Sequence, residues 1–207
     1  MQAEDRFEPA PETQAPIHEL LARRWSPRTF SARPVEAAKL ARLFQAARWA
    51  PSSFNAQPWA FVLVTGEDAV GHDRLLRTLA ETNRLWAQGA PVLVLAVAQL
   101  DFDHNGRPNR HALYDLGQAV ADLTVEATSL DLHIHQMAGF DARLARELFA
   151  IPTGFEPATV LALGYLGGAG RPPVSRTRKP LADFVFTGSW GRPAPLGLEK
   201  QSETRTA

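Results

Sequence analysis

The sequence contains no cysteine among its 207 residues. Disulfide bonds, thiol catalysis and thiolate metal sites are therefore excluded. Acidic and basic side chains balance at 22 each, so the composition gives no reason to expect nucleic acid or an anionic membrane as a partner. No apolar segment approaches the length of a membrane span, and no apolar run follows a basic start. From these absences we expect a globular protein of the cytoplasm.

The chain length suits one domain with its own hydrophobic core. Residues 1–16 are acidic and rich in proline and alanine, which predicts a mobile N-terminal arm. We expect the domain to span residues 17–190 and a C-terminal tail to span residues 191–207. The basic, Gly/Pro-rich stretch 167–180 is interpreted as an arm of the kind that wraps a neighbouring subunit. No internal repeat divides the chain.

Hydrophobic periodicity predicts interleaved helices and strands. Helices are expected over 17–24, 34–50, 73–87, 112–130 and 141–149, with Asp141 as the cap of the last one. Strands are expected over 59–64, 91–98, 133–137 and 159–166. The run "PVLVLAVA" at 91–98 is almost continuously apolar, which is typical of a strand that is buried on both faces. Long helices with four or five strands predict an α+β domain.

Two patterns superficially indicate other binding sites. "GYLGGAG" at 164–170 is similar to a dinucleotide loop, but such a loop needs a helix directly after it, and Arg171-Pro172-Pro173 does not start one. We interpret it as a turn. His133 and His135 share one face of the short strand, but a zinc site needs three or four ligands and no partner lies at a telling spacing. We therefore predict no metal site.

Three segments carry polar groups suited to a ligand. "RRWSPR" at 23–28 holds three guanidinium groups and a hydroxyl, which fits either a solvated helix end or an anion clamp. "RTRK" at 176–179 is a second basic cluster, and alone it is most often a solvated loop. "PSSFNAQPW" at 51–59 places small hydroxyl and amide side chains between two prolines, which predicts hydrogen bonds to a ligand. Pro58 and Trp59 fit a rigid turn that begins the next strand.

"RWSPRTF", followed by a helix and then "APSSFNAQPWAFVLV", resembles the flavin-dependent nitroreductase family. That family carries an Arg-x-Ser-x-Arg/Lys segment, a helix, and a Pro-Ser-Ser-x-Asn-x-Gln-Pro-Trp loop that leads into a strand. The resemblance continues through "DLGQAVADLTVEATSLDLH", "QMAGFDARLARELFAIPTGFEPATVLALGYLG" and "RTRKPLADFVF", in the right order. It implies a small, mostly antiparallel sheet flanked by long helices in an intertwined homodimer.

The resemblance also implies an FMN site at the dimer interface. Arg24 and Ser26 would lie at the phosphate and ribityl chain, and Arg28 at the pyrimidine edge. Arg176 and Arg178 would complete the phosphate clamp. The predicted cofactor-binding residues are Arg24, Trp25, Ser26, Arg28, Pro51, Ser52, Ser53, Asn55, Asn83, Met137, Ala138, Gly139, Arg176 and Arg178.

Within this set, Pro51, Ser52, Ser53 and Asn55 would come from the second subunit. The backbone at residues 138–139 would face the flavin N5, and Asn83 would reach the isoalloxazine.

Two positions depart from the family pattern. Trp25 stands where the family often has a second basic or polar residue. Gln136-Met137-Ala138-Gly139 replaces a loop that carries proline at its start and glutamate before the glycine in well-known members. The contact to N5 uses a backbone amide, so we expect it to persist. The changes bear on the polarity and size of the substrate cavity.

The expected activity follows from the flavin. NADH or NADPH would reduce FMN, which would pass two electrons to a nitroaromatic, quinone or similar electron-poor acceptor in a ping-pong cycle. A cation near the pyrimidine edge favours the anionic reduced flavin. No general acid or base is evident in the chain, and FAD is not expected because no Gly-rich loop opens a helix. The alternatives are a dehalogenase, a dehydrogenase or a flavin-consuming enzyme on the same scaffold, or a non-catalytic flavin-binding protein.

Overall fold

A computed structural model describes residues 13–168, 170, 172 and 176–197. Contacts divide these residues into two compact units. The larger unit spans 24–171, and the smaller one joins 13–23 to the described residues after 171. Most of the predicted mobile arm, 1–12, and most of the predicted tail, 198–207, lie outside the described residues.

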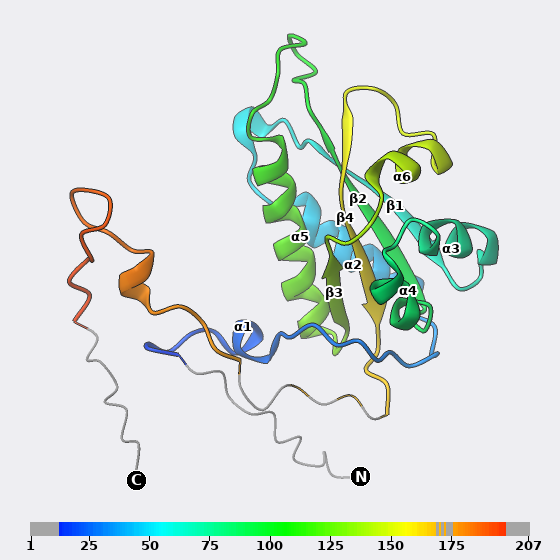
Figure 1. The fold of residues 1–207 in the computed structure, drawn as a ribbon, viewed down its shortest axis with the longest axis horizontal. Coiled ribbons are helices and arrows are strands. Elements are labelled where there is room, and N and C mark those ends of the chain that lie inside the picture. The colour runs from blue at the N-terminus through cyan, green and yellow to red at the C-terminus, as the bar shows by residue number, and fades with distance from the viewer. Residues whose placement is uncertain (1–12, 169, 171, 173–175, 198–207) are drawn as a thin grey trace. The chain divides into compact units, whose positions relative to one another are not determined.

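The larger unit is built on a four-stranded antiparallel sheet with the order β1-β2-β4-β3 (Figure 1). The strands are β1 (Trp59–Thr65), β2 (Val92–Gln99), β3 (His133–Met137) and β4 (Phe155–Gly164). The registers place Trp59 opposite Ala98, Val92 opposite Leu163, and His133 opposite Gly164. The predicted α+β class with a small antiparallel sheet is confirmed, although β4 begins earlier than the sequence indicated.

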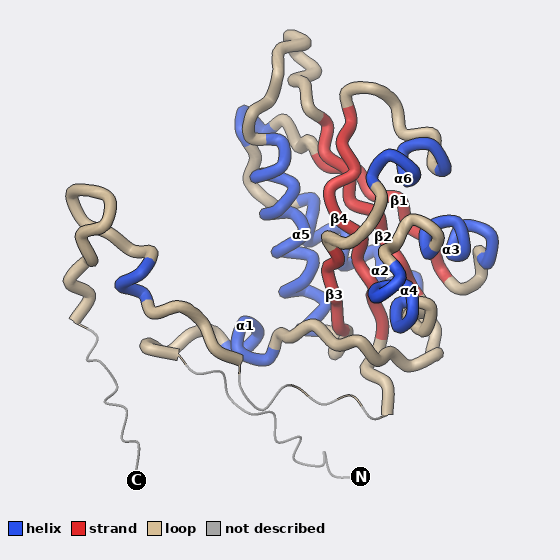
Figure 2. Tube along the Cα trace, viewed as in Figure 1, coloured by secondary structure: helices blue, strands red, loops and turns tan. Residues whose placement is uncertain are grey.

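Helices cover both faces of this sheet (Figure 2). On one face lie α2 (Ala37–Arg48) and α5 (Ala112–Ser129), and on the other lie α3 (Ala69–Leu76), α4 (Glu81–Ala87) and α6 (Ala142–Leu148). The central strand β2 is buried from Val92 to Ala98, as its apolar run predicts. Its side chains alternate between the two cores, because successive residues of a strand point to opposite faces.

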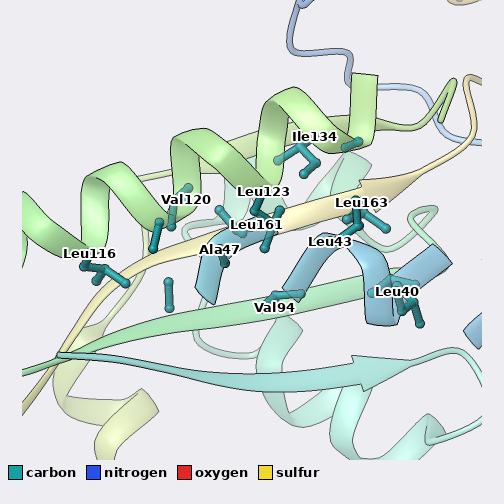
Figure 3. Packing of buried hydrophobic residues seen from close by; sticks show 14 of the residues in the cluster. Leu40, Leu43, Ala47, Val94, Leu116, Val120, Leu123, Ile134, Leu161 and Leu163 are labelled. Carbon is teal, nitrogen blue, oxygen red and sulfur yellow. The ribbon is translucent and has the colours of Figure 1, made fainter. Parts of the chain in front are cut away.

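The core beneath α5 consists of aliphatic side chains from α2, α5 and the sheet (Figure 3). Leu116 and Leu123 of α5 point toward the sheet, and Leu43 of α2 is fully buried with them. Each such leucine stabilises the fold by roughly 1.5–3 kcal/mol relative to an exposed side chain. α5 is therefore a rigid support for the segments that contact its two ends.

The prediction of one helix over 73–87 is wrong. The chain forms α3 and α4 with a break over 77–80. The buried hydroxyl of Thr78 donates to the carbonyl of Leu75 at 2.7 Å, and Leu79 pairs with Phe140 in an isolated bridge. The N–H of Ala80 then donates to the carbonyl of Gly139 at 2.9 Å. Tertiary pairing with the loop after β3 outweighs the local helical periodicity.

Helix caps fix the beginnings of two helices. Asp141 caps α6 as predicted, since its carboxylate accepts from the N–H of Leu144 at 2.9 Å. Asp68 caps α3 in the same way through the N–H of Gly71, at 2.8 Å. None of the helices in the described part of the chain has the length and hydropathy that crossing a membrane requires.

The smaller unit contains α1 (Glu19–Arg23) and a 3₁₀ turn over Leu181–Asp183. The N–H of Leu181 donates to the side chain of Gln14 at 2.8 Å, which joins the two stretches of this unit. A bridge between Phe186 and Pro193 closes a hairpin that exposes Trp190 to 92%. This unit carries much of the stretch that the sequence marks as an arm.

Candidate functional site

The predicted phosphate-binding segment is extended. Trp25 and Pro27 are buried while Ser26 and Arg28 are exposed, and this alternation is typical of an extended chain with one face on the protein. The side chain of Arg24 donates to the hydroxyl of Ser26 at 3.3 Å. Arg24, Ser26 and Arg28 therefore form a polar strip on the side that faces away from the buried residues.

This segment is fixed to the sheet at β3 and after β4. Trp25 contacts His133 edge to face, with ring centroids 5.7 Å apart. The Nδ1–H of His135 donates to the carbonyl of Pro27 at 2.9 Å, since a carbonyl only accepts. Beyond the strip, Phe30 pairs with Leu166. The polar strip consequently has a rigid backbone beneath it.

His135 is held in its neutral form by its surroundings. Burial lowers its pKa below the usual value of 6.5, and the charge of Arg28 lowers it further. The hydrogen bond to the carbonyl of Pro27 acts in the opposite direction. The positive charge beside β3 is thus carried by the arginines of the strip and not by the histidine.

The loop after β3 lies beside α4. The carbonyl of Gly139 accepts from the side-chain amide of Asn83 at 3.1 Å and from the N–H of Ala80 at 2.9 Å. Among the backbone hydrogen bonds of the described residues, none uses the N–H of Gly139. A Cβ at this position would lie 2.8 Å from Asn83 Nδ2, so a larger residue would displace the end of the Asn83 side chain. Gly139 is exposed, and its N–H is a candidate donor to a ligand.

α4 also links this loop to the polar strip. The ring of Trp86 lies 4.5 Å from that of His135, and Asn83 lies one helical turn before Trp86. Met137 is buried to 2% exposure, so that only its backbone is available to a ligand. The strip, His135, α4 and Gly139 are therefore linked by consecutive contacts along β3.

The loop 51–57 carries backbone strain. Phe54, Asn55 and Gln57 have φ values of 54°, 53° and 49°, in the left-handed region that non-glycine residues rarely adopt. The hydroxyl of Ser52 accepts from the N–H of Gln57 at 3.0 Å, which closes the loop on itself. Asn55 is exposed, and Phe54 is exposed to 83%. The loop presents these two side chains outward.

One residue that sequence reasoning missed holds this loop. Asp115 of α5 is buried to 2% exposure, and its carboxylate accepts the N–H of Ser53 at 3.0 Å. The signal was present in the sequence, because Asp115 shares the apolar face of Ala119 and Leu123 at helical spacing. An acid on the buried face of a helix indicates a specific hydrogen-bonding partner.

Within one chain, the predicted site residues fall into separate groups. The polar strip adjoins β3 beyond the C-terminal end of α5, whereas the loop 51–57 adjoins its N-terminal end (Figure 1). α5 has 18 residues, which at about 1.5 Å each separates its ends by roughly 25 Å. Arg176 and Arg178 belong to the smaller unit, so their place at the phosphate stays a prediction.

A family model and solved structures match this chain. The model of the Nitroreductase family matches residues 21–165. A 15.4 kDa protein of Mycolicibacterium smegmatis, encoded in the 5′ region of ask, is 39% identical over 140 residues, which are 62% of this chain and 92% of that protein.

Among solved structures, an oxidoreductase containing FMN is 29% identical with a TM-score of 0.80, covering 93% of this chain and all of the other. A nitroreductase family protein of Clostridium difficile is 24% identical with a TM-score of 0.70, covering 83% of this chain and 97% of the other. The second likeness concerns the fold alone.

Proposed function

The chain belongs to the nitroreductase family, and from this premise we propose that it is an FMN-dependent oxidoreductase. Bound FMN would supply the redox chemistry, taking two electrons from NADH or NADPH and passing them to a nitroaromatic, quinone or similar electron-poor acceptor. The observation that carries the proposal is the series of contacts along β3, with Arg24 and the exposed Arg28 at one end and the N–H of Gly139 at the other. We propose that the polar strip would hold the phosphate and the pyrimidine edge of this cofactor, and the loop after β3 the reacting edge of its ring.

The phosphate would be held by the polar strip. Arg24 and Ser26 already approach one another at 3.3 Å, so a guanidinium group and a hydroxyl are directed to one place. A guanidinium binds phosphate through two parallel hydrogen bonds, and FMN phosphate carries close to two negative charges. We propose that Arg176 and Arg178 complete this clamp. Arg28 would lie at the pyrimidine edge, where its charge stabilises an anionic ring.

The loop after β3 would position the reacting edge of the flavin. Its peptide is fixed because the carbonyl of Gly139 has two donors, Asn83 and Ala80. The N–H of Gly139 is then available to donate to N5, in line with the contact expected from the family resemblance. This role needs a backbone amide and no particular side chain, which accords with the altered residues 136–138.

The site would be completed by a second copy of the chain. The exposed face of α5 carries Leu113 and Tyr114, 54% and 68% exposed, followed by the small residues Gly117 and Ala121. A Cβ at Gly117 would meet nothing within 4 Å, so another helix can approach closely. Pairing through this face would bring the loop 51–57 of one subunit to the strip of the other. We therefore propose a homodimer whose loop donates Ser52, Ser53 and Asn55 in trans.

Donor and acceptor are proposed to use one slot in turn. In the only Gly-rich stretch of the sequence that is a candidate for a second nucleotide site, 164–170, the N–H of Gly170 donates to the carbonyl of Gly167 at 2.8 Å. No helix in the described part of the chain follows it directly. Steady-state kinetics should then give parallel double-reciprocal lines, while intersecting lines would indicate a ternary complex.

The decisive experiment is anaerobic reduction followed by an acceptor panel. The purified protein should be yellow and release about one FMN per chain on heating. NADH or NADPH should bleach the bound flavin, and a nitroaromatic or quinone should restore its colour. Release of FAD, or of no flavin, would refute the cofactor. Absence of bleaching would support a flavin store or sensor, and bleaching without turnover would support another chemistry on this scaffold.

A further inference from the structure

Asp115 is a buried acid that the flavin chemistry does not use. It lies in the first turn of α5, and its backbone N–H donates to the carbonyl of His111 at 2.8 Å. None of the ion pairs between described residues includes it. A buried carboxylate is costly unless donors compensate it. Here the compensation comes from the N–H of Ser53 and from the positive end of the α5 dipole.

The other polar contacts of Asp115 also lead to the loop. The side-chain amide of Gln118, one turn further along α5, lies 3.5 Å from Asp115 Oδ1 and 3.4 Å from the carbonyl of Pro51. Asp115 and Gln118 thus hold two consecutive parts of the loop, at Pro51 and at Ser53. Both belong to a helix whose inner face is fixed by leucine packing.

The loop needs such an external support. Its three left-handed residues each raise its energy by about 1–2 kcal/mol relative to ordinary backbone. The bonds at Ser52, from Gln57 to its hydroxyl and from Asn55 to its carbonyl, are internal to the loop. Internal bonds preserve the shape of a loop but do not fix its position on the protein. The bond from Ser53 to Asp115, with the longer contact from Gln118 to the carbonyl of Pro51, fixes that position.

We propose that Asp115 is a positioning residue for the cofactor site of the neighbouring subunit. Its carboxylate holds Ser53, and through Ser53 the strained residues that follow, so that the exposed side chain of Asn55 is presented outward. The inference rests on the proposed function, because it takes the loop to contact FMN. Asp115 itself touches neither cofactor nor substrate.

The test compares two substitutions of Asp115 with a matched control. Asp115→Asn keeps the shape and one acceptor oxygen, whereas Asp115→Ala removes the acceptor. Thr124→Val is the control: Thr124 is also buried on α5, at 5% exposure, but its hydroxyl donates only to the carbonyl of Val120 within the helix, at 2.7 Å. The full-length apo-protein is titrated with FMN, and the visible circular dichroism of the bound flavin is recorded at saturation.

We expect a graded loss of affinity. Asp115→Ala should raise the Kd for FMN roughly tenfold or more, and Asp115→Asn by about threefold, because a neutral acceptor makes a weaker hydrogen bond than a charged one. Both should change the dichroism of the bound flavin. Thr124→Val should leave the Kd within about twofold and the dichroism unaltered, even where urea unfolding shows that it is destabilised.

Each outcome separates this inference from the proposed function. If the wild-type protein binds no FMN, the proposed function and this inference are both refuted. If it binds FMN and the Asp115 variants keep its Kd and dichroism, the positioning role is refuted and the proposed function stands. Equal losses of affinity in Asp115→Asn and Thr124→Val would assign the effect to general destabilisation and would also overturn the inference. Should Asp115→Ala fail to fold, Asp115→Asn gives the answer.

Discussion

The side-chain amide of Asn83 donates to the carbonyl of Gly139 at 3.1 Å and joins α4 to the loop after β3. The two residues lie so close that a Cβ on residue 139 would be 2.8 Å from Asn83 Nδ2. The contact accompanies the break over 77–80, where the chain leaves α3 after Leu76 and starts α4 at Glu81. The break in the predicted helix therefore shapes the loop that we propose to face the flavin.

Gly139→Ala should slow flavin reduction with little effect on folding. The added methyl group would displace the far end of the Asn83 side chain and shift the peptide whose N–H we assign to N5. A loss of about 1.4 kcal/mol of transition-state stabilisation corresponds to about a tenfold slower reduction by NADH or NADPH, measured anaerobically by stopped flow. Gly66→Ala is the control, since its nearest neighbour would be 3.8 Å away. Equal rates in the two variants would contradict the assignment.

Much of the fold could be predicted from hydrophobic pattern. The apolar run of β2 and the cap at Asp141 each specify an element by local chemistry. The prediction of one helix over 73–87 was wrong because Leu75, Leu79 and Trp86 keep helical spacing across the break. What interrupts the helix is pairing with Phe140 and Gly139, far along the chain. No local pattern encodes that competition.

For the candidate site, the sequence could indicate candidate residues but not their contacts. Ser26 and Arg28 are exposed beside the buried Trp25 and Pro27, and their role as cofactor ligands stays a prediction. The strain of the loop could not be predicted, because its left-handed residues include no glycine to indicate it. Its support by Asp115 depends on a contact between residues 62 positions apart. The sequence showed only an acid on an apolar helix face, without its partner.

Arg24→Ala and Arg178→Ala should each weaken FMN binding. Loss of one charge-assisted contact to phosphate costs on the order of 1.5–3 kcal/mol, or roughly a tenfold to hundredfold increase in Kd. Titration of the apo-protein with FMN measures the effect. Arg74→Ala removes the same charge from α3, where the guanidinium lies 5.8 Å from the ring of Phe149, and should leave the Kd unchanged. Unaltered affinity in both test variants would refute the phosphate clamp.

Ala121→Arg should dissociate the proposed dimer. Ala121 is exposed on α5 in the same row as Leu113 and Gly117, and an arginine there would introduce bulk and like charges where two helices approach. Sedimentation should show a dimer for the wild-type protein at micromolar concentration and a monomer with weakened FMN binding for the variant. The control variant Val70→Arg, at an exposed position of α3, should remain dimeric. A stable FMN-bound monomer of the wild-type chain would contradict the shared site.

A mixed dimer tests which residues act in trans. Arg24→Ala and Asn55→Ala should each impair both sites of a homodimer. In a heterodimer of the two variants, both lesions would fall in one site and the other site would be intact. Such a heterodimer, isolated with two different affinity tags, should recover about half of the wild-type activity per dimer. Activity no better than that of either variant homodimer would mean that the strip and the loop do not serve one flavin from two chains.

His135 should make the stability of the protein depend on pH. Its pKa is lowered from 6.5 in the folded state, chiefly by burial, so the unfolded chain binds a proton at a higher pH than the folded chain does. Well above pH 6.5 both states are neutral at this residue and it contributes no pH dependence. Below that pH the unfolded state gains the proton first, and the free energy of unfolding decreases until the pH falls below the folded-state pKa.

The measurement is urea unfolding at about pH 8 and about pH 5, for the wild-type protein and for His135→Gln. Glutamine can still donate to the carbonyl of Pro27 but does not titrate, so the fall in the unfolding midpoint between the two pH values should be smaller in the variant. His104→Gln, on the exposed hairpin between β2 and α5, should behave as the wild-type protein does. An identical fall in the wild-type protein and His135→Gln would show that the proton is taken up elsewhere.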